Sequence, residues 1–165
     1  MPRATMLARW LVFGAAGAMA IFCASSPGHA QRRGRASAVR VAVGETAGSE
    51  GDAQQAAALA GAISAALDHA PDVRLTSARR AQLVVRGSVV RLERTRVAEG
   101  FEVRCEVSLI VADARGGSVR AMLRGRAGAR GGQDVARLRA NALQAAVRGA
   151  LRPLGAHGRA LARGH

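Results

Sequence analysis

Lysine and tyrosine are absent from this sequence, and cysteine, tryptophan and phenylalanine are scarce, with two, one and three copies in 165 residues. Without lysine the protein can form neither a lysine Schiff base nor the lysine contact of a phosphate-binding P-loop. Two cysteines are too few for a small fold held together by disulfides. All 25 strongly basic side chains are therefore arginines, and with 11 acidic residues they give a formal net charge of +14. A chain of this length and composition predicts one globular domain.

Residues 1–30 have the pattern of a secretory signal peptide. Arg3 and Arg9 supply the positive start, residues 10–24 form an apolar run, and small residues precede a cleavage position after Ala30. The apolar run is shorter than the roughly 20 residues that a membrane-spanning helix needs. We therefore expect an exported protein that is periplasmic or secreted after cleavage near Ala30.

Two other interpretations of this segment stay open. One is an uncleaved membrane anchor at the amino terminus, and the other is a lipoprotein acylated at Cys23. The bulky Phe22 before that cysteine is unusual for an acylation site. Removal of residues 1–30 would leave one aromatic residue, Phe101, and one cysteine, Cys105, which cannot form an intrachain disulfide.

The rest of the sequence predicts a single α/β domain over residues 38–154. Residues 31–37 are basic and aperiodic, which indicates a flexible arm. Residues 155–165 are rich in glycine, alanine and arginine and are predicted to be a disordered tail. The expected element order is β-α-β-β-β-β-α, with a mixed four- to five-stranded sheet and two helices packed on one face. This α+β arrangement is a two-layer α/β sandwich.

The strongest strand signal is the alternation of apolar and polar residues over 101–112, which repeats over 119–126. Apolar residues occupy odd positions in both strands, and directly paired residues share one face of a sheet. A three-residue loop over 115–117 pairs odd positions with odd positions, and so places the apolar residues of both strands on the same face. That register places Glu106 opposite Arg126 and Ser108 opposite Arg124. In the strand over 83–97 the apolar positions change from odd to even near Val89–Val90, which indicates either a β-bulge or a strand that projects beyond the core.

Helix signals flank these strands. Asp52 and Gln55 have the spacing of a capping box at a helix start, and this helix should end near Ala70 before a proline. Asp134 opens the last helix, which we expect Pro153 to end or kink.

No catalytic set stands out. His69, His157 and His165 lack the spacing of metal ligands, and Cys105 lies on the predicted buried face. Glu102 and Glu106 share a strand face but lie roughly 13 Å apart, which is wide for a glycosidase pair. We therefore predict no catalytic, cofactor-binding or metal-binding residues, and we expect no enzyme and no cofactor.

Arginines dominate the predicted open face of the sheet, where a binding surface is expected at Arg86, Arg104, Arg120, Arg124 and Arg126. An arginine excess can attract acidic polymers or anionic lipid surfaces, although it can also reflect a GC-rich coding bias. Proteins that bind single-stranded nucleic acid stack bases on aromatic side chains, and this face offers none. We therefore do not expect nucleic acid as a partner, and the oligomeric state stays open.

The segment Ala81-Gln-Leu-Val-Val-Arg-Gly-Ser-Val89, which follows a strand, an alanine-rich helix and a short strand, resembles small envelope domains of Gram-negative bacteria. This group includes the penicillin-binding-protein activator LpoB, the periplasmic part of the curli secretion protein CsgG and the amino-terminal domain of TolB. The resemblance spans residues 38–154 and implies a non-catalytic domain that works by protein–protein contact. No functional residue carries over. Phe22 departs from the lipoproteins of the group, and the membrane-inserting segments of the curli channel are missing.

The sequence thus leads to one main hypothesis and two alternatives. The main one is an exported, non-enzymatic envelope domain that binds a partner protein or assembly through its open arginine-rich sheet face and nearby loops. The first alternative is a binder of polyanions such as nucleic acid, lipopolysaccharide or another acidic polymer. The second is a small secreted hydrolase whose site is assembled from residues far apart in the sequence.

Overall fold

The computed structural model describes residues 38–163, so the predicted signal peptide and basic arm lie outside the described residues. The strands and helices follow the expected order. They are β1 (Val39–Ala47), α1 (Ala53–Asp68), β2 (Val73–Leu75), β3 (Leu83–Val97), β4 (Gly100–Asp113), β5 (Val119–Gly131) and α2 (Val135–Arg163), with short 3-10 turns η1 (Ser49–Gly51) and η2 (Ala78–Arg80).

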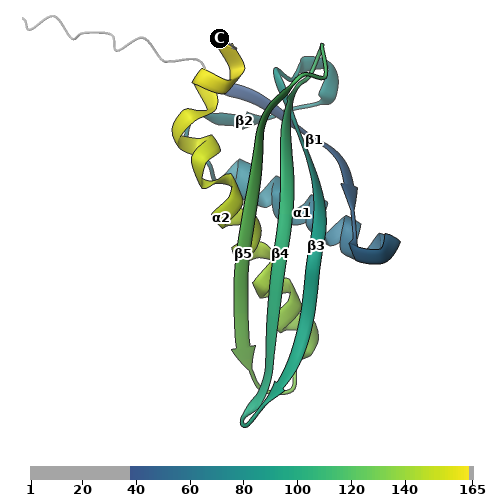
Figure 1. Cartoon of the computed structure of the whole chain (residues 1–165). Helices are drawn as coiled ribbons and strands as arrows, with labels where there is room; N and C mark the ends of the chain where they lie inside the picture. Colours follow the sequence, from purple (N-terminus) through teal and green to yellow (C-terminus); the bar gives the residue numbers. More distant parts are fainter. Residues whose placement is uncertain (1–37, 164–165) are drawn as a thin grey trace, which may run out of the picture. The chain divides into compact units, whose positions relative to one another are not determined.

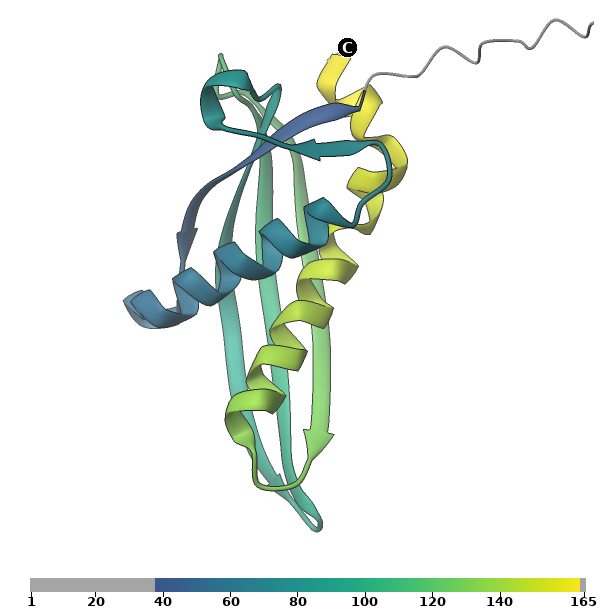
Figure 2. The ribbon, with the colours of Figure 1, turned by 180° about the vertical axis from the view of Figure 1, so that it is seen from behind.

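The strands form one mixed sheet in the order β2-β1-β3-β4-β5 (Figure 1). β1 is parallel to both β2 and β3, whereas β3, β4 and β5 are antiparallel neighbours. Both helices cover the same face of the sheet (Figure 2), where α1 packs on β1 and β3 and α2 packs on β4 and β5. The predicted α+β sandwich is therefore confirmed.

Small aliphatic side chains build the core between the helices and the sheet. The largest fully buried side chains come from α1, α2 and the three strands β1, β3 and β4, and they are Leu59, Ile63, Leu67, Leu83, Leu109, Leu154, Val41, Val85, Val103, Val107, Val111 and Val147. Helical spacing in the sequence predicts an apolar stripe in α1 at Ala56, Leu59, Ala60, Ile63 and Leu67, of which the leucines and the isoleucine are buried and the two alanines half-buried. In α2 the same spacing predicts Ala136 and Ala140 at the start of the stripe, but both are exposed, and Leu138 and Ala142 are buried instead. The prediction for the first turns of α2 was wrong because the helix meets the sheet with a different side of those turns.

The register between β4 and β5 is the predicted one, since Glu106 lies opposite Arg126 and Ser108 opposite Arg124. At the turn the pairing slips by one residue, and Arg120 is the residue that the register skips. Gly117, with φ of +67°, closes this turn in a conformation that glycine adopts without strain.

β3 contains a bulge, which is one of the two alternatives that its apolar pattern indicated. Val89 pairs with Val107 and Arg91 pairs with Glu106, so Val90 is the extra residue and is 55% exposed. Beyond the bulge, Leu92 takes the helix-facing side opposite Cys105. The bulge therefore explains the change from odd to even apolar positions.

The helix starts form as predicted, with one change in the capping box. Asp52 accepts hydrogen bonds from the backbone N–H groups of Gln54 and Gln55, and Asp134 accepts one from Arg137. The Gln55 side chain does not return to Asp52. Its Oε1 accepts from the backbone N–H and the hydroxyl of Ser49, which ties η1 to the start of α1.

The predicted disordered tail is wrong, because α2 continues through Pro153 to Arg163. Leu154 and Gly158, which both follow Pro153 in the helix, are buried, and Gly158 faces Val39. Arg159 forms an ion pair with Asp72. Pro153 itself is exposed. The helix continues past it because the packing of the neighbouring residues outweighs the backbone hydrogen bond that a proline removes. Neither helix in residues 38–163 combines the length and apolar character needed to cross a membrane.

Candidate functional site

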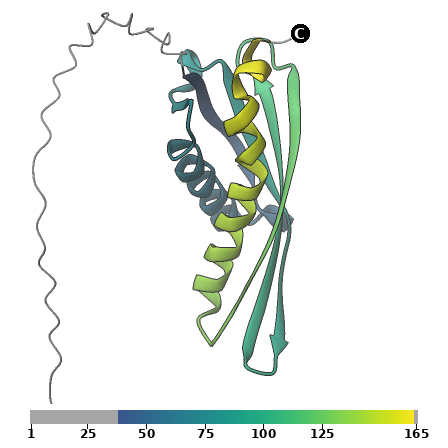
Figure 3. The same ribbon diagram turned by 90° about the vertical axis from the view of Figure 1, so that its left-hand side faces the viewer.

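The side of β3, β4 and β5 that is turned away from both helices is called the open face here (Figure 3). Each of residues 101–112 in β4 lies between one partner from β3 and one from β5, and these sets of three form rows across the sheet. Every second row has its side chains on the open face. From the β3–β4 turn toward the β4–β5 turn, these open-face rows are Thr95–Glu102–Arg130, Glu93–Arg104–Gly128, Arg91–Glu106–Arg126, Ser88–Ser108–Arg124 and Arg86–Ile110–Met122.

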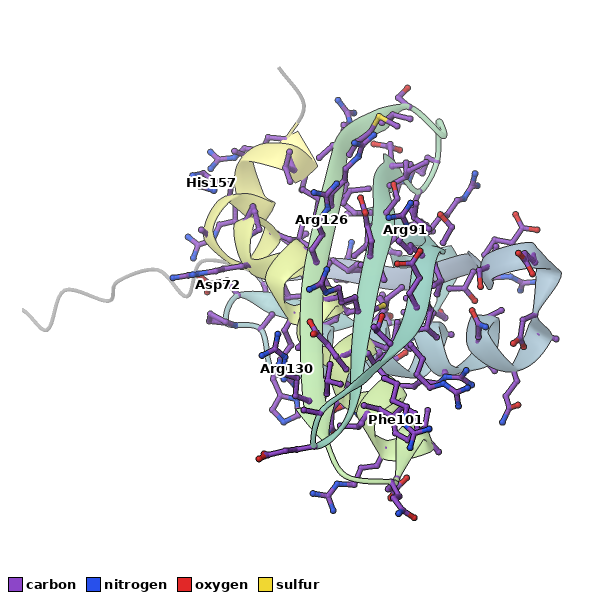
Figure 4. All side chains as sticks on the ribbon, turned by 60° about the horizontal axis from the view of Figure 1, so that its bottom comes forward. Asp72, Arg91, Phe101, Arg126, Arg130 and His157 are labelled. Carbon is purple, nitrogen blue, oxygen red and sulfur yellow. The ribbon has the colours of Figure 1, made fainter. Side chains whose placement is uncertain are left out.

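The first three rows form a network of compensated charge. Arg104 donates to Glu102 at 2.8 Å, Arg130 lies 3.0 Å from the other oxygen of Glu102, and Arg126 donates to Glu106 at 2.9 Å. The two carboxylates are 13% and 20% exposed because the arginines lie over them. Figure 4 shows Arg126 and Arg130 on β5, with Arg91 on the opposite side of β4.

These contacts change the acidity of Glu102. The hydrogen bond from Arg104 holds the pKa of Glu102 below its usual value, the contact with Arg130 adds to this effect, and partial burial acts against it. Glu102 is therefore held as an ionised partner of two arginines, and Glu106 forms an ion pair with Arg126. A general acid would need a raised pKa and an unpaired carboxyl. The ion pairs make both carboxylates part of an arginine-compensated sheet face.

The last two rows have a different character, and we call Arg86, Ser108, Ile110, Met122 and Arg124 the Met122 patch. Arg86 and Arg124 are exposed, and the described part of the chain contains no ion pair for either. Met122 is 71% exposed and lies opposite the half-buried Ile110. A hollow of about 300 Å³ lies at this end of the face, between Ser108, Ile110 and Arg86 and the end of β1.

The five predicted binding arginines therefore divide into three groups. Arg86 and Arg124 lie in the Met122 patch, and Arg104 and Arg126 lie in the compensated rows. Sequence reasoning missed Met122, whose signal was an apolar residue at a position that alternation assigns to the polar side of the strand.

Arg120 is separate from the other four, because it lies in the irregularity at the β4–β5 turn. One of its terminal nitrogens donates to Asp113 at 3.2 Å, and its Nε is buried without a partner among the described residues. Asp113 also accepts from the backbone N–H groups of Gly116 and Arg115, and these bonds together with Arg120 lower the pKa of Asp113. Arg120 therefore stabilises the turn.

Cys105 and His69 have contacts typical of structural rather than catalytic residues. Cys105 is 2% exposed, and burial raises the pKa of its thiol to about 11, so it stays protonated at neutral pH. The Nδ1 of His69 lies 2.7 Å from the carbonyl oxygen of Ala65 at the end of α1. Residues 38–163 contain no group of three or more histidine, cysteine or acidic side chains that could hold a metal ion. His165 lies outside the described residues.

A larger hollow, with a volume of about 720 Å³, lies on the opposite side of the domain between α1 and α2. Alanine is the most frequent residue in its lining, and the ionisable side chains among its lining residues are His69, Arg148 and Arg152. No carboxylate or cysteine belongs to this lining, so the hollow lacks the paired acid and base of a hydrolase site.

Comparisons with known proteins identify the fold. No family model matches the chain, and no curated protein matches it. Solved structures do match. PelC from Paraburkholderia phytofirmans, solved as a dodecamer, is 18% identical with a TM-score of 0.56, and the match covers 72% of this chain and 89% of PelC. The chain shares this fold.

Two further solved structures support the same conclusion. Protein XCC0632 from Xanthomonas campestris, assigned to the family DUF330, is 12% identical with a TM-score of 0.54, over 77% of this chain and 86% of that one. A protein from Caulobacter crescentus that is assigned as a lipoprotein is 21% identical with a TM-score of 0.50, over 76% of this chain and 92% of that one. At these identities the likeness shows the fold alone. The specific resemblance to LpoB, CsgG and TolB stays a prediction.

Proposed function

We propose that this chain is a non-catalytic domain of the bacterial envelope that binds an acidic partner protein through its open face, centred on the Met122 patch. The observation that carries the proposal is the combination of a 71% exposed methionine with two arginines for which the structure describes no ion pair. An exposed methionine beside free guanidinium groups is a typical composition for the centre of a protein interface, because methionine and arginine are enriched there.

The charges of the open face support an acidic partner. In the compensated rows each carboxylate already has an arginine, whereas Arg86 and Arg124 are available to a new carboxylate. Arginine can bind a carboxylate through two parallel hydrogen bonds, which gives both affinity and orientation. The Met122 side chain, in the same row as Arg86 and next to the row of Arg124, would add apolar contact area when water is excluded.

Export and the absence of catalysis rest on separate observations. The pattern of residues 1–30 is that of a signal peptide, with the lipoprotein and anchored forms as alternatives. Structures with the same fold include one assigned as a lipoprotein and one that forms a dodecamer, so the fold occurs in proteins of this kind. The candidate acids Glu102 and Glu106 are paired with arginines, and the Cys105 thiol is buried with a raised pKa, so none of these three is arranged as an acid, base or nucleophile.

The test is capture of a partner from a bacterial envelope extract by wild-type and charge-reversed protein. Arg86→Glu combined with Arg124→Glu should abolish capture of a discrete protein. The matched control reverses Arg137 and Arg139, which are exposed on α2, and should leave capture unchanged. Urea unfolding of each variant confirms the fold. Equal capture by both double variants would contradict the proposal.

A polyanion is the alternative occupant of the same face, and its support is the excess of arginine over acid along β5. Salt separates the two functions. Binding of a polymer such as dextran sulfate should weaken linearly on a log–log plot of affinity against salt, because counterions are released. The proposal expects a shallower slope for the partner protein. The one aromatic residue in 38–163, Phe101, packs on the helix side under Arg94, so the open face has no platform for base stacking.

A further inference from the structure

β5 forms one edge of the sheet and is unusually long for an edge strand. It covers 13 residues, and its neighbour in the sheet order is β4. No other strand within residues 38–163 pairs with its outer side. The outer side therefore presents unpaired backbone N–H and C=O groups, which can pair with a strand from another chain. Figure 3 shows this side of the domain, with α2 running along the sheet.

The side chains of β5 specify what kind of strand fits. Arg124, Arg126 and Arg130 point to the open face and are exposed. On the helix side the residues of β5 are small or aliphatic and half-buried, as at Leu123 and Ala127. A strand added outside β5 would therefore meet a row of guanidinium groups on one face and apolar side chains on the other.

β4 shows that β5 already accepts such a strand on its inner side. There Glu102 and Glu106 lie opposite Arg130 and Arg126, and both pairs are closed by ion pairs. The alternate residues of β4, such as Val103, are buried under α2. Directly opposed residues on a sheet face lie about 5 Å apart. The carboxylates of a second acidic strand outside β5 could therefore reach the exposed arginines. Arg124 is the most available of them, since the structure describes no ion pair for it.

A second copy of this chain fits poorly at the same edge. An antiparallel pair of β5 strands centred on Gly125 places Arg124 of one copy opposite Arg126 of the other, and Arg120 opposite Arg130. Like charges in directly opposed positions destabilise a sheet. Charged residues on an edge strand are a common means of preventing self-association.

We propose that the outer edge of β5 binds an extended acidic segment of a partner protein as a sixth strand. Acidic residues at alternate positions of that segment would lie beside Arg124, Arg126 and Arg130. Its intervening apolar residues would pack beside Leu123 and Ala127. The inference rests on the proposed function and specifies the partner as a strand with alternating acidic and apolar residues.

The test uses a synthetic probe, an acetylated and amidated decapeptide of alternating glutamate and valine with a fluorescent label. Its binding to the purified protein is measured by fluorescence anisotropy. Two further versions carry N-methyl groups on every second amide, one in each phase. Because only one phase of an added strand points its N–H groups at β5, one methylated version should bind at least tenfold more weakly and the other should bind nearly as well as the parent.

Protein variants complete the test. Arg124→Glu should weaken the parent peptide at least tenfold, whereas the control Arg139→Glu on α2 should leave its affinity unchanged. A peptide with lysine in place of glutamate should not bind. Failure of the glutamate peptide to bind would overturn the inference, as would equal affinities for both methylated versions. A wild-type dimer that Arg124→Glu dissociates would also overturn it, by making a second copy the occupant.

The proposed function has its own readout in the capture experiment. Partner capture that survives while both methylated peptides bind equally would mean that the open face binds its partner without strand pairing. Peptide binding without partner capture would leave the edge site standing and remove the role of the Met122 patch.

Discussion

Glu102 on β4 and Arg130 on β5 are cross-strand partners whose charged groups lie 3.0 Å apart. The same carboxylate binds Arg104 on its own strand, so one acidic side chain holds two arginines on the open face. Removal of this carboxylate would leave those arginines close together without a counter-charge. The contribution of Glu102 to stability should therefore appear in how the unfolding free energy changes as the pH is lowered.

The change is Glu102→Gln. The pKa of Glu102 is lower in the folded protein than in the unfolded chain, mainly through Arg104. The ionised carboxylate therefore stabilises the fold above the ordinary glutamate pKa of about 4.3, and this stabilisation is lost as pH falls through the lower folded pKa. Urea midpoints measured from pH 7 down to pH 2.5 should fall less steeply for Glu102→Gln than for wild type. Glu99→Gln, in the exposed β3–β4 turn, is the control and should follow the wild-type profile.

Gly125 is a point of close approach between α2 and the sheet. A Cβ atom at this position would collide with the carbonyl oxygen of Ala146 and would lie 2.9 Å from the Cβ of Ala150. Gly125→Ala should therefore destabilise the protein by about 1–3 kcal/mol, measured by urea unfolding. Gly128→Ala is the matched control on the same strand, since its nearest contact would be at 3.6 Å, and it should change stability by less than about 0.5 kcal/mol.

Two helix glycines should respond in the opposite direction. A Cβ atom at Gly61 in α1 or at Gly149 in α2 would meet nothing within 4 Å. Because alanine favours a helix over glycine by about 1 kcal/mol, Gly61→Ala and Gly149→Ala should each raise the unfolding free energy by about 0.5–1 kcal/mol. A loss of stability in either variant would mean that the helix surface there is covered.

The end of α2 offers a test of the corrected tail. Leu161 and Ala162 pack against the core, and Gly158 faces Val39. Deletion of residues 155–165 should lower the unfolding free energy by at least about 1 kcal/mol, because it exposes apolar surface at the start of β1. An unchanged urea midpoint would support the disordered tail that the sequence indicated.

Cys105 should be protected from thiol reagents. Its side chain is 2% exposed and burial raises its pKa to about 11, so both access and thiolate formation are low at pH 8. Reaction with a chromogenic disulfide reagent should be at least a hundredfold slower in the native protein than in urea. Rapid reaction under native conditions would show that α2 opens readily from the sheet.

The β4–β5 pairing could be predicted from the sequence because period-two alternation and the parity of the loop leave few registers. Glu106 opposite Arg126 followed directly. The alternation did not encode the one-residue slip at the turn, so Arg120 was placed with the binding arginines although it supports Asp113. A bulge changes pairing without changing composition, and only the backbone path reveals it.

Other differences have similar physical causes. The helical end of α2 was missed because Pro153 and the glycines that follow oppose a helix locally, whereas contacts to Val39 from a distant strand favour it. Met122 was not predicted as part of the binding surface, because the sequence does not show whether a neighbouring element covers a single apolar residue or leaves it exposed. The free state of Arg86 and Arg124 depends on side-chain geometry, which neither spacing nor composition contains.

The central claim is that the open face, and not the helix face, contacts the partner. A photo-crosslinking amino acid placed at Met122 and, in a separate variant, at the exposed Ala136 of α2 tests it in living bacterial cells. The account predicts a discrete crosslinked band from position 122 that disappears when Arg86 and Arg124 are reversed to glutamate, and none from position 136. A band from position 136 alone, or one from position 122 that persists after the charge reversal, would contradict it.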